Sequence, residues 1–231
     1  MTAAEPSRDC PLCPRLAAFR NAQRELHPDW HNAPVPPFGD AGARLLIVGL
    51  APGLRGANRT GRPFTGDHAG ELLYATLGKF DFAQGTFRAD PHDGLTLTGA
   101  MITNAVRCVP PENKPVPEEI RTCNQFLRAR IDALPRLAAI VALGRIAHDA
   151  ALMALGQTRA RFPFTHGGVH EVGGHRLFDS YHCSRYNTNT GVLTARMFEE
   201  VFAAVAEFLN GSQNLSSPDL FRRPIHPLTD R

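Results

Sequence analysis

The densest group of chemically useful residues is a glycine-rich loop at 49–67, which reads GLAPGLRGANRTGRPFTGD. Glycine lets backbone amides approach a ligand closely. Phe64 adds a flat apolar face and Asp67 adds a carboxylate, while Arg59 and Arg62 suit a polyanionic substrate. The loop follows an apolar run, so these residues predict an active-site loop at the end of a buried strand.

Two further polar groups stand where apolar runs end. Asn104 follows the run 95–103, and its side-chain amide offers a donor and an acceptor side by side. His182 follows the run 176–181 and opens the motif HCSRYN, and a neutral imidazole donates one hydrogen bond. Each has a structural alternative, because asparagine also caps turns and a histidine can be satisfied in the core.

Two residues of the glycine-rich loop also allow both a functional and a structural interpretation. Asp67 stands directly before a helical segment, where aspartate is a good N-cap. Phe64 can anchor the loop in the core instead of presenting its ring to a ligand. Catalysis and structure are therefore both open at these two positions.

Four cysteines have a spacing that suits metal ligation. Cys10 and Cys13 form a C-x-x-C, and Cys108 and Cys123 follow far downstream with fourteen residues between them. Four thiolates can hold one tetrahedral metal or one cubane cluster, and counting does not separate zinc from iron–sulfur. The alternative is a set of buried free cysteines. Cys183 lies inside HCSRYN, and we expect it to pack rather than to ligate.

Composition predicts a folded protein of one sizeable core. The chain has 231 residues, of which 43% are hydrophobic and 20% are charged. Its formal net charge of +3 is too small to indicate nucleic acid by itself. No apolar run approaches a membrane span, and the N-terminus has no signal-peptide core. A cytoplasmic location without disulfides is therefore expected.

Strand-like and helix-like segments alternate along the chain. Apolar runs predict strands at 44–48, 95–103, 137–143 and 176–181, and apolar periodicity predicts helices at 68–79, 118–134, 145–155 and 193–208. Such alternation predicts an α/β fold with a mostly parallel sheet covered on both faces. We expect a single domain over 1–210 and a disordered tail over 211–231, which is polar and rich in serine and proline.

Ligands of open α/β sheets bind at the carboxyl ends of the strands. Loop 49–67, Asn104 and His182 all follow predicted strands, and Gly144-Arg145 opens a helix that can hold a phosphate. An aromatic ring, a carboxylate, an amide, an imidazole and several guanidiniums are therefore expected to meet at one edge. We predict that they line one small cavity.

Four ordered motifs carry a family resemblance. They are GLAPG at 49–53, GANRTGRPFTGD at 56–67, TNAVRC at 103–108 and HCSRYN at 182–187. Together with the cysteines they resemble family 5 uracil-DNA glycosylases, the B-type branch with an iron–sulfur cluster, over roughly residues 10–208. Several motifs in order are far more specific than any one of them.

The resemblance implies a fold, an activity and a cofactor. The fold is a three-layer α/β/α sandwich with a short, mostly parallel four-stranded central sheet. The activity is hydrolysis of the N-glycosidic bond of uracil, and of other deaminated or damaged bases, in DNA after base flipping, which leaves an abasic site. The cofactor is a [4Fe–4S] cluster held by Cys10, Cys13, Cys108 and Cys123.

The resemblance also implies roles for individual residues. Phe64 stacks on the flipped base, and Asn104 bonds its Watson–Crick edge. His182 donates to the carbonyl oxygen where the leaving base gathers charge, and Asp67 holds or activates the attacking water. The first-motif residues expected at the base are Gly49, Ala51, Pro52 and Gly53.

DNA contacts are expected around the last motif and on the arginines. Arg185 and Tyr186 are placed to fill the gap left by the flipped base, while Ser184 and Asn187 hold the loop or a phosphate. The arginines considered for backbone phosphates are Arg55, Arg59, Arg62, Arg107 and Arg145. Any one of them is more often a solvated surface charge.

Two positions depart from the relatives' patterns, and the tail carries one further motif. Leu50 stands where a GEAPG-type relative has a carboxylate, which leaves Asp67 as the nearest acid in the loop. Gly53 stands where the B-type pattern usually has alanine.

In the tail, SPDLF at 217–221 resembles the peptide with which bacterial repair proteins dock on the sliding clamp, although the usual leading glutamine is absent.

The expected partners are double-stranded and also single-stranded DNA containing uracil, bound by a monomer in the cytoplasm near the nucleoid, with no membrane partner. One alternative is a metal- or cluster-bearing nucleic-acid-binding module without catalysis. Another is a glycosylase that acts mainly on a different deaminated base such as hypoxanthine.

Overall fold

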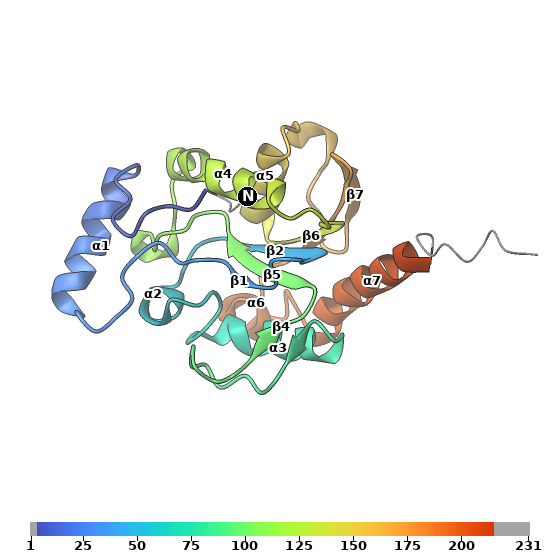
Figure 1. Ribbon diagram of the computed structural model, residues 1–231, viewed down its shortest axis with the longest axis horizontal. Helices are drawn as coiled ribbons and strands as arrows, with labels where there is room; N and C mark the ends of the chain where they lie inside the picture. Colours follow the sequence, from blue (N-terminus) through green and yellow to red (C-terminus); the bar gives the residue numbers. More distant parts are fainter. Residues whose placement is uncertain (1–3, 215–231) are drawn as a thin grey trace, which may run out of the picture.

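A six-stranded sheet forms the centre of the molecule (Figure 1). The computed structural model describes residues 4–214. The strand order is β1-β5-β2-β6-β8-β7. The four inner strands are parallel and comprise β5 (Ala100–Asn104), β2 (Leu45–Gly49), β6 (Ala139–Leu143) and β8 (His175–Ser180). The edge strands β1 (Phe38–Gly39) and β7 (Val169–Val172) are antiparallel to their neighbours.

The predicted mostly parallel sheet is confirmed, and its four inner strands correspond to the four predicted ones. Two edge strands are added. Strand β1 has only two residues, too few to give a periodic pattern, and β7 is largely exposed. The predicted strand 95–103 is divided at Gly99, whose φ of +62° turns the chain. Its first part, β4 (Thr96–Leu97), pairs with β3 (Ala83–Gln84) in a separate small sheet.

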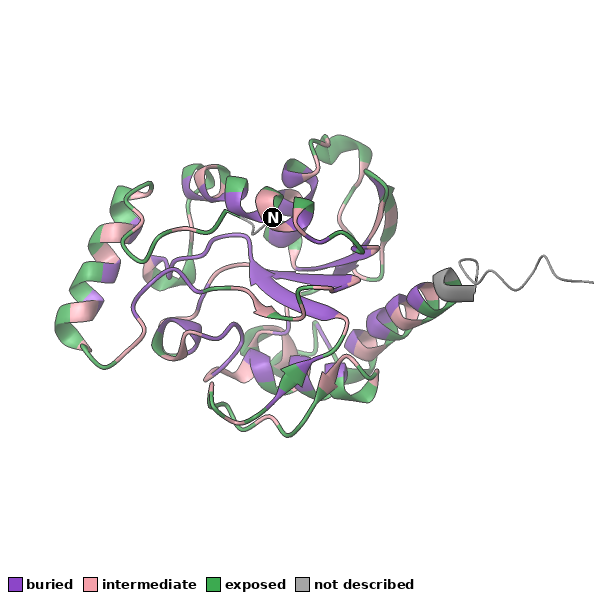
Figure 2. Cartoon of the chain, viewed as in Figure 1, coloured by how far each residue is buried: buried purple, intermediate pink, exposed green. Residues whose placement is uncertain are grey.

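Two pairs of helices cover the two faces of the sheet. On one face α3 (His68–Lys79) contacts α7 (Ala195–Asn214), and on the other α4 (Pro117–Asp132) contacts α5 (Arg145–Ala154). Successive side chains of β2 point to opposite faces. Leu45 and Ile47 pack in the core on one face of the sheet, and Leu46 and Val48 pack in the core on the other. The result is the expected three-layer α/β/α sandwich, and its four inner strands are almost entirely buried (Figure 2).

Three further helices lie near the carboxyl ends of the strands or beside the sheet. Helix α1 (Pro14–Leu26) stands apart from the sheet and packs through Leu16 on a small core that contains the cysteines (Figure 1). Helix α2 (Ala57–Thr60) lies within the glycine-rich loop, and α6 (Arg185–Asn189) follows β8.

The last helix ends later than predicted. Helix α7 continues to Asn214, so residues 211–214 belong to this helix. The clamp-like segment 217–221 lies outside the described residues. Across residues 4–214, no helix combines the length and apolarity needed to cross a membrane.

Candidate active site

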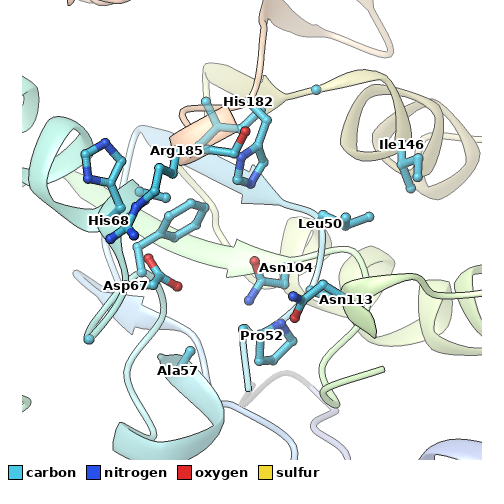
Figure 3. A pocket seen from close by; sticks show the side chains of 18 of the residues that line it. Leu50, Pro52, Ala57, Asp67, His68, Asn104, Asn113, Ile146, His182 and Arg185 are labelled. Carbon is cyan, nitrogen blue, oxygen red and sulfur yellow. The ribbon is translucent and has the colours of Figure 1, made fainter. Parts of the chain in front are cut away.

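A cavity of about 770 Å³ opens where the parallel strands end. Asp67, Asn104 and His182 point into the same space (Figure 3), and Phe64 also lines it. The structure therefore brings together the four side chains expected to meet. The volume lies within the range of small-molecule sites and is larger than the small cavity that the sequence led us to expect.

Phe64 is held by its own loop in an unusual conformation. Its φ of +52° is in the left-handed region, and its side chain is 6% exposed. The hydroxyl of Tyr74 donates to the carbonyl of Pro63 at 2.7 Å, which fixes the backbone just before the ring. A residue other than glycine is rarely left-handed without such support. The strain is consistent with a ring that must present one defined face.

Gly49 lies beneath the cavity rather than in its wall. A Cβ at this position would stand 2.7 Å from the ring of Phe64 and 2.4 Å from Oδ1 of Asn104. Any side chain would therefore push both groups out of place. The cavity wall is formed by the next residues, Leu50, Ala51, Pro52 and Gly53, and a contact between Gly49 and the substrate stays a prediction.

His182 is presented by the turn that follows β8. The side-chain amide of Asn187 donates to its carbonyl oxygen at 2.8 Å and fixes the backbone. The imidazole centroid lies 5.9 Å from that of Phe64, with 27° between the planes. Desolvation lowers the pKa of His182 to about 4, so the ring is neutral near pH 7. No described residue accepts a hydrogen bond from this ring, which leaves its N–H for a ligand.

Asp67 occupies the N-cap position of α3. Its backbone is extended, and its side chain forms no capping hydrogen bond of regular geometry, although the amides of Ala69 and Gly70 lie close to the carboxyl. Oδ1 is buried and has no hydrogen-bond partner among the described residues. Burial raises the pKa of the carboxyl, and the nearby amides of Ala69 and Gly70 oppose that shift. An unsatisfied buried carboxylate oxygen at a cavity wall is expected where a ligand or water supplies the missing donor.

Asn104 ends β5 and is nearly buried, at 4% exposed. Its amide faces the cavity beside Asn113 (Figure 3). Asn113 is left-handed at φ +57° in the loop after Cys108. The sequence prediction missed Asn113, and no spacing could have identified it. It also missed His68 and Ile146, although each lies within two residues of a strand-end motif.

Arg62 does not meet DNA, which corrects the sequence-based expectation. Its side chain is 5% exposed and forms two 2.8 Å bonds with Asp93, which is fully buried. The guanidinium also lies over the rings of Phe38, Tyr74 and Phe87. An arginine with these partners stabilises the interior and cannot reach a phosphate.

Arg107 is also internal. It is 2% exposed and donates to the carbonyl of Val35 and the hydroxyl of Thr103. By contrast Arg55 and Arg59 are exposed, as is Arg145 at the start of α5. Of these three exposed arginines, Arg145 lines the cavity.

The HCSRYN segment divides into supporting and exposed residues. Ser184 caps α6 by accepting from the amide of Asn187, so both residues hold the turn. Arg185 is exposed and lines the cavity, and Tyr186 is 73% exposed. Cys183 is fully buried, and its thiol donates to the carbonyl of Ala69 at 3.5 Å, as expected of a packing residue.

The other four cysteines surround one small pocket beside α1. Cys10, Cys13, Cys108 and Cys123 all line it and are free. Desolvation raises the pKa of Cys13 to about 11 and that of Cys123 to about 12. Buried thiols of this kind become thiolates only when a positive group binds them.

The surroundings of these thiols fit an anionic metal–thiolate group. The guanidinium of Arg20 approaches Cys108 Sγ at 3.8 Å, and the backbone amide of Arg107 donates to Cys123 Sγ at 3.3 Å. Thiolates around one zinc ion stand about 3.8 Å apart, given a Zn–S bond of about 2.3 Å. Within residues 4–214 no three cysteine sulfurs lie mutually within 4.8 Å. The sulfurs are therefore not gathered as closely as four ligands of one zinc ion would be.

Comparisons with known proteins agree with this geometry. A family model described as the uracil DNA glycosylase superfamily matches residues 36–206. A type-5 uracil-DNA glycosylase of Thermus thermophilus is 47% identical over 83% of this chain and 90% of its own length. Proteins of the same name from Pyrobaculum aerophilum and Mycobacterium bovis are 41% and 42% identical, over 86% and 84% of this chain and 88% and 75% of their own lengths.

Proposed function

The chain belongs to the uracil DNA glycosylase superfamily, and we propose that it removes uracil from DNA at the cavity between Phe64 and His182. It is a hydrolase that acts on N-glycosyl bonds. The observation that carries the assignment of the site is the convergence of Phe64, Asp67, Asn104 and His182 on one cavity. A base inside a duplex cannot reach such a cavity, so the nucleotide must be flipped out.

Three residues recognise the flipped base. Phe64 stacks on its face, and base–aromatic stacking contributes about 1–3 kcal/mol. Asn104 pairs its amide donor and acceptor with the base edge. Asn113 lies beside Asn104 in the cavity wall and supplies a second amide within the same region.

Bond cleavage produces charges of both signs. The electron pair of the C1′–N bond leaves with the base, and the neutral His182 stabilises the resulting anion by donating its N–H to a base carbonyl oxygen. The sugar becomes cationic at C1′, and the carboxylate of Asp67 stabilises it. Asp67 also orients the water that adds to C1′ and accepts its proton, which yields the abasic site and the free base.

The four cysteines hold an iron–sulfur cluster in this proposal. Cys10 and Cys13 precede α1, while Cys108 and Cys123 flank the loop that carries Asn113. When bound, the cluster supplies iron–thiolate bonds that join these segments. Glycosidic hydrolysis involves no net redox change, so the chain's own residues perform the reaction and the cysteine site serves structure.

DNA is held by the exposed positive side chains around the cavity. Arg59, Arg145 and Arg185 contact backbone phosphates, and Tyr186 enters the gap that the flipped nucleotide leaves. Double-stranded and single-stranded substrates are both compatible with a cavity that opens at the sheet edge.

The decisive experiment is excision from a labelled oligonucleotide. Purified protein is incubated with one uracil in duplex DNA, and alkali then cleaves at abasic sites. We expect cleavage at the uracil position only, none with a thymine control, and strong loss with His182→Ala. Binding without alkali-labile product would instead indicate a nucleic-acid-binding module. Competition with oligonucleotides that carry hypoxanthine then measures the base range.

The metal assignment is tested separately. Protein purified without oxygen is examined for iron, acid-labile sulfide and visible absorbance, beside Cys10→Ser and the control Cys183→Ser. We expect the chromophore to be lost in Cys10→Ser and kept in Cys183→Ser. Zinc in place of iron in the wild type would reject the cluster.

A further inference from the structure

Outside the cavity, three potential metal ligands from three elements meet in the interior. His148 belongs to α5, His170 to β7 and Asp179 to β8. His148 Nδ1 lies 2.7 Å from Asp179 Oδ1, and His170 Nε2 lies 3.1 Å from Asp179 Oδ2. Within the described part of the chain, this is the set of histidine, cysteine or acidic side chains whose ligand atoms all lie within 4.8 Å of one another.

The buried carboxylate requires a positive partner. The side chains of Asp179 and His148 are 0% and 1% exposed, and that of His170 is 14% exposed. Among residues 4–214 no arginine or lysine pairs with Asp179. A buried carboxylate is stable only when it is paired or coordinates a metal. The site must therefore hold an additional proton on a histidine or a bound cation.

The orientation of His148 favours metal ligation. Its Nε2 lies 2.8 Å from the carbonyl oxygen of Phe162, which can only accept, so Nε2 carries the hydrogen. Nδ1 faces the Asp179 carboxylate as a hydrogen-bond donor, and loss of that proton frees its lone pair for a metal at the same place. Metal-binding histidines commonly donate their other ring N–H to a backbone carbonyl in this way. The rings of Phe162 and Phe164 stand edge-on around the two imidazoles and form an apolar shell.

We propose that His148, His170 and Asp179 form a structural site for a divalent transition metal, with zinc the best match. Two imidazole nitrogens and one carboxylate are a ligand set that zinc accepts. The metal takes the place of the direct contacts to Asp179, and any proton held on His148 Nδ1 is released to solvent when it binds. The partial exposure of His170 provides the route of entry.

Such a site acts on the strand that presents His182. Asp179 also pairs through its backbone with the loop before β7, donating to the carbonyl of Gly168 and accepting from the amide of Gly167. Metal binding therefore fastens that loop, the β7–β8 hairpin and α5 together three residues before His182. Its role is mechanical, since none of the three ligands lines the cavity.

The first test measures bound zinc. The full chain is exposed to two equivalents of Zn²⁺ and desalted, and zinc is counted in wild type, His170→Ala, Asp179→Asn and the control His92→Ala. His92 is exposed and lines neither pocket. Because the cysteines also bind zinc, the readout is the difference in bound zinc per chain between the four proteins. We expect wild type and His92→Ala to hold one zinc more than the other two, and equal zinc in all four overturns the proposal.

The second test needs no variant to fold. Imidazole ¹⁵N signals of the wild type are followed by NMR as Zn²⁺ is added. We expect the signals of His148 Nδ1 and His170 Nε2 to move together to metal-bound positions. If His148 keeps a proton on both nitrogens in excess Zn²⁺, the triad is a buried ion pair and the metal site is rejected.

Discussion

The rings of Phe64 and His182 face each other across the cavity wall, with centroids 5.9 Å apart and planes 27° from parallel. A base stacked between two rings needs about 7 Å, twice the 3.4 Å stacking distance of DNA. The flipped base therefore cannot be sandwiched between them in this conformation. In the proposed mechanism the base stacks on Phe64 alone, and His182 meets its edge, which is the position required of a hydrogen-bond donor.

Replacing His182 by alanine is expected to lower single-turnover excision by roughly 10²–10³-fold, the usual effect of losing one such donor. The fold should persist, because the described residues accept no hydrogen bond from the ring. The measurement is a single-turnover rate beside a circular dichroism spectrum. A rate within a few-fold of wild type would remove His182 from the mechanism.

The depressed pKa of His182 makes a separate prediction about stability. Its folded value is about 4 and an unfolded histidine titrates near 6.5. Between these values the unfolded chain binds more protons, so the free energy of unfolding falls as pH is lowered from 6.5 to 4. We expect denaturant titrations of His182→Gln to show a smaller decrease in the free energy of unfolding between pH 6.5 and 4 than those of the wild type. Identical pH slopes would mean that the ring is not buried in its neutral form.

Asp67→Asn separates catalysis from helix capping. A functional N-cap loses about 0.5–2 kcal/mol when its side chain is removed. Because the Asp67 side chain makes no capping bond and burial raises its pKa, we expect the variant to be at least as stable as wild type. Excision should nevertheless fall strongly. Thermal unfolding and single-turnover rates measured on the same preparation decide this, and a destabilised but active variant would restore the capping role.

Gly53 and Gly56 both lie beside the carboxylate of Asp67, so alanine substitutions at the two positions can be compared directly. A Cβ at Gly56 would stand 2.5 Å from Oδ2 of Asp67, whereas one at Gly53 would stand 3.1 Å away. The first distance forces the carboxylate to move, and the second requires a shift of only a few tenths of an ångström. We expect Gly56→Ala to lose most activity while staying folded, and Gly53→Ala to stay within a few-fold of wild type. Equal activities would show that the position of Asp67 is not critical.

The sheet and the four converging side chains were predictable because both depend on local patterns. Four apolar runs fixed the inner strands, and polar residues directly after them, such as Asn104 and His182, had to share the carboxyl edge. The edge strand β1 gave no signal, since two residues carry no periodicity.

The wrong predictions concerned burial, which a motif does not encode. Arg62 lies in the same loop as the exposed Arg59, and only the fold shows that its partner is Asp93, thirty-one residues later. The triad of His148, His170 and Asp179 could not be found from spacing either, because it joins a helix and two strands.

Arg62 and Arg185 are expected to differ in what their loss changes. Arg62→Ala leaves Asp93 buried and unpaired, so unfolding should become easier by about 3–5 kcal/mol. The paired Asp93 has a lowered pKa, and this stabilisation should therefore disappear as pH falls below its ordinary value of 3.8.

Arg185 is exposed at the cavity mouth, and Arg185→Ala should leave stability unchanged but reduce the slope of log affinity against log salt by about 0.9. Denaturant unfolding and salt-dependent DNA binding measure the two effects. A lower salt slope in Arg62→Ala with wild-type stability would return that arginine to the DNA surface.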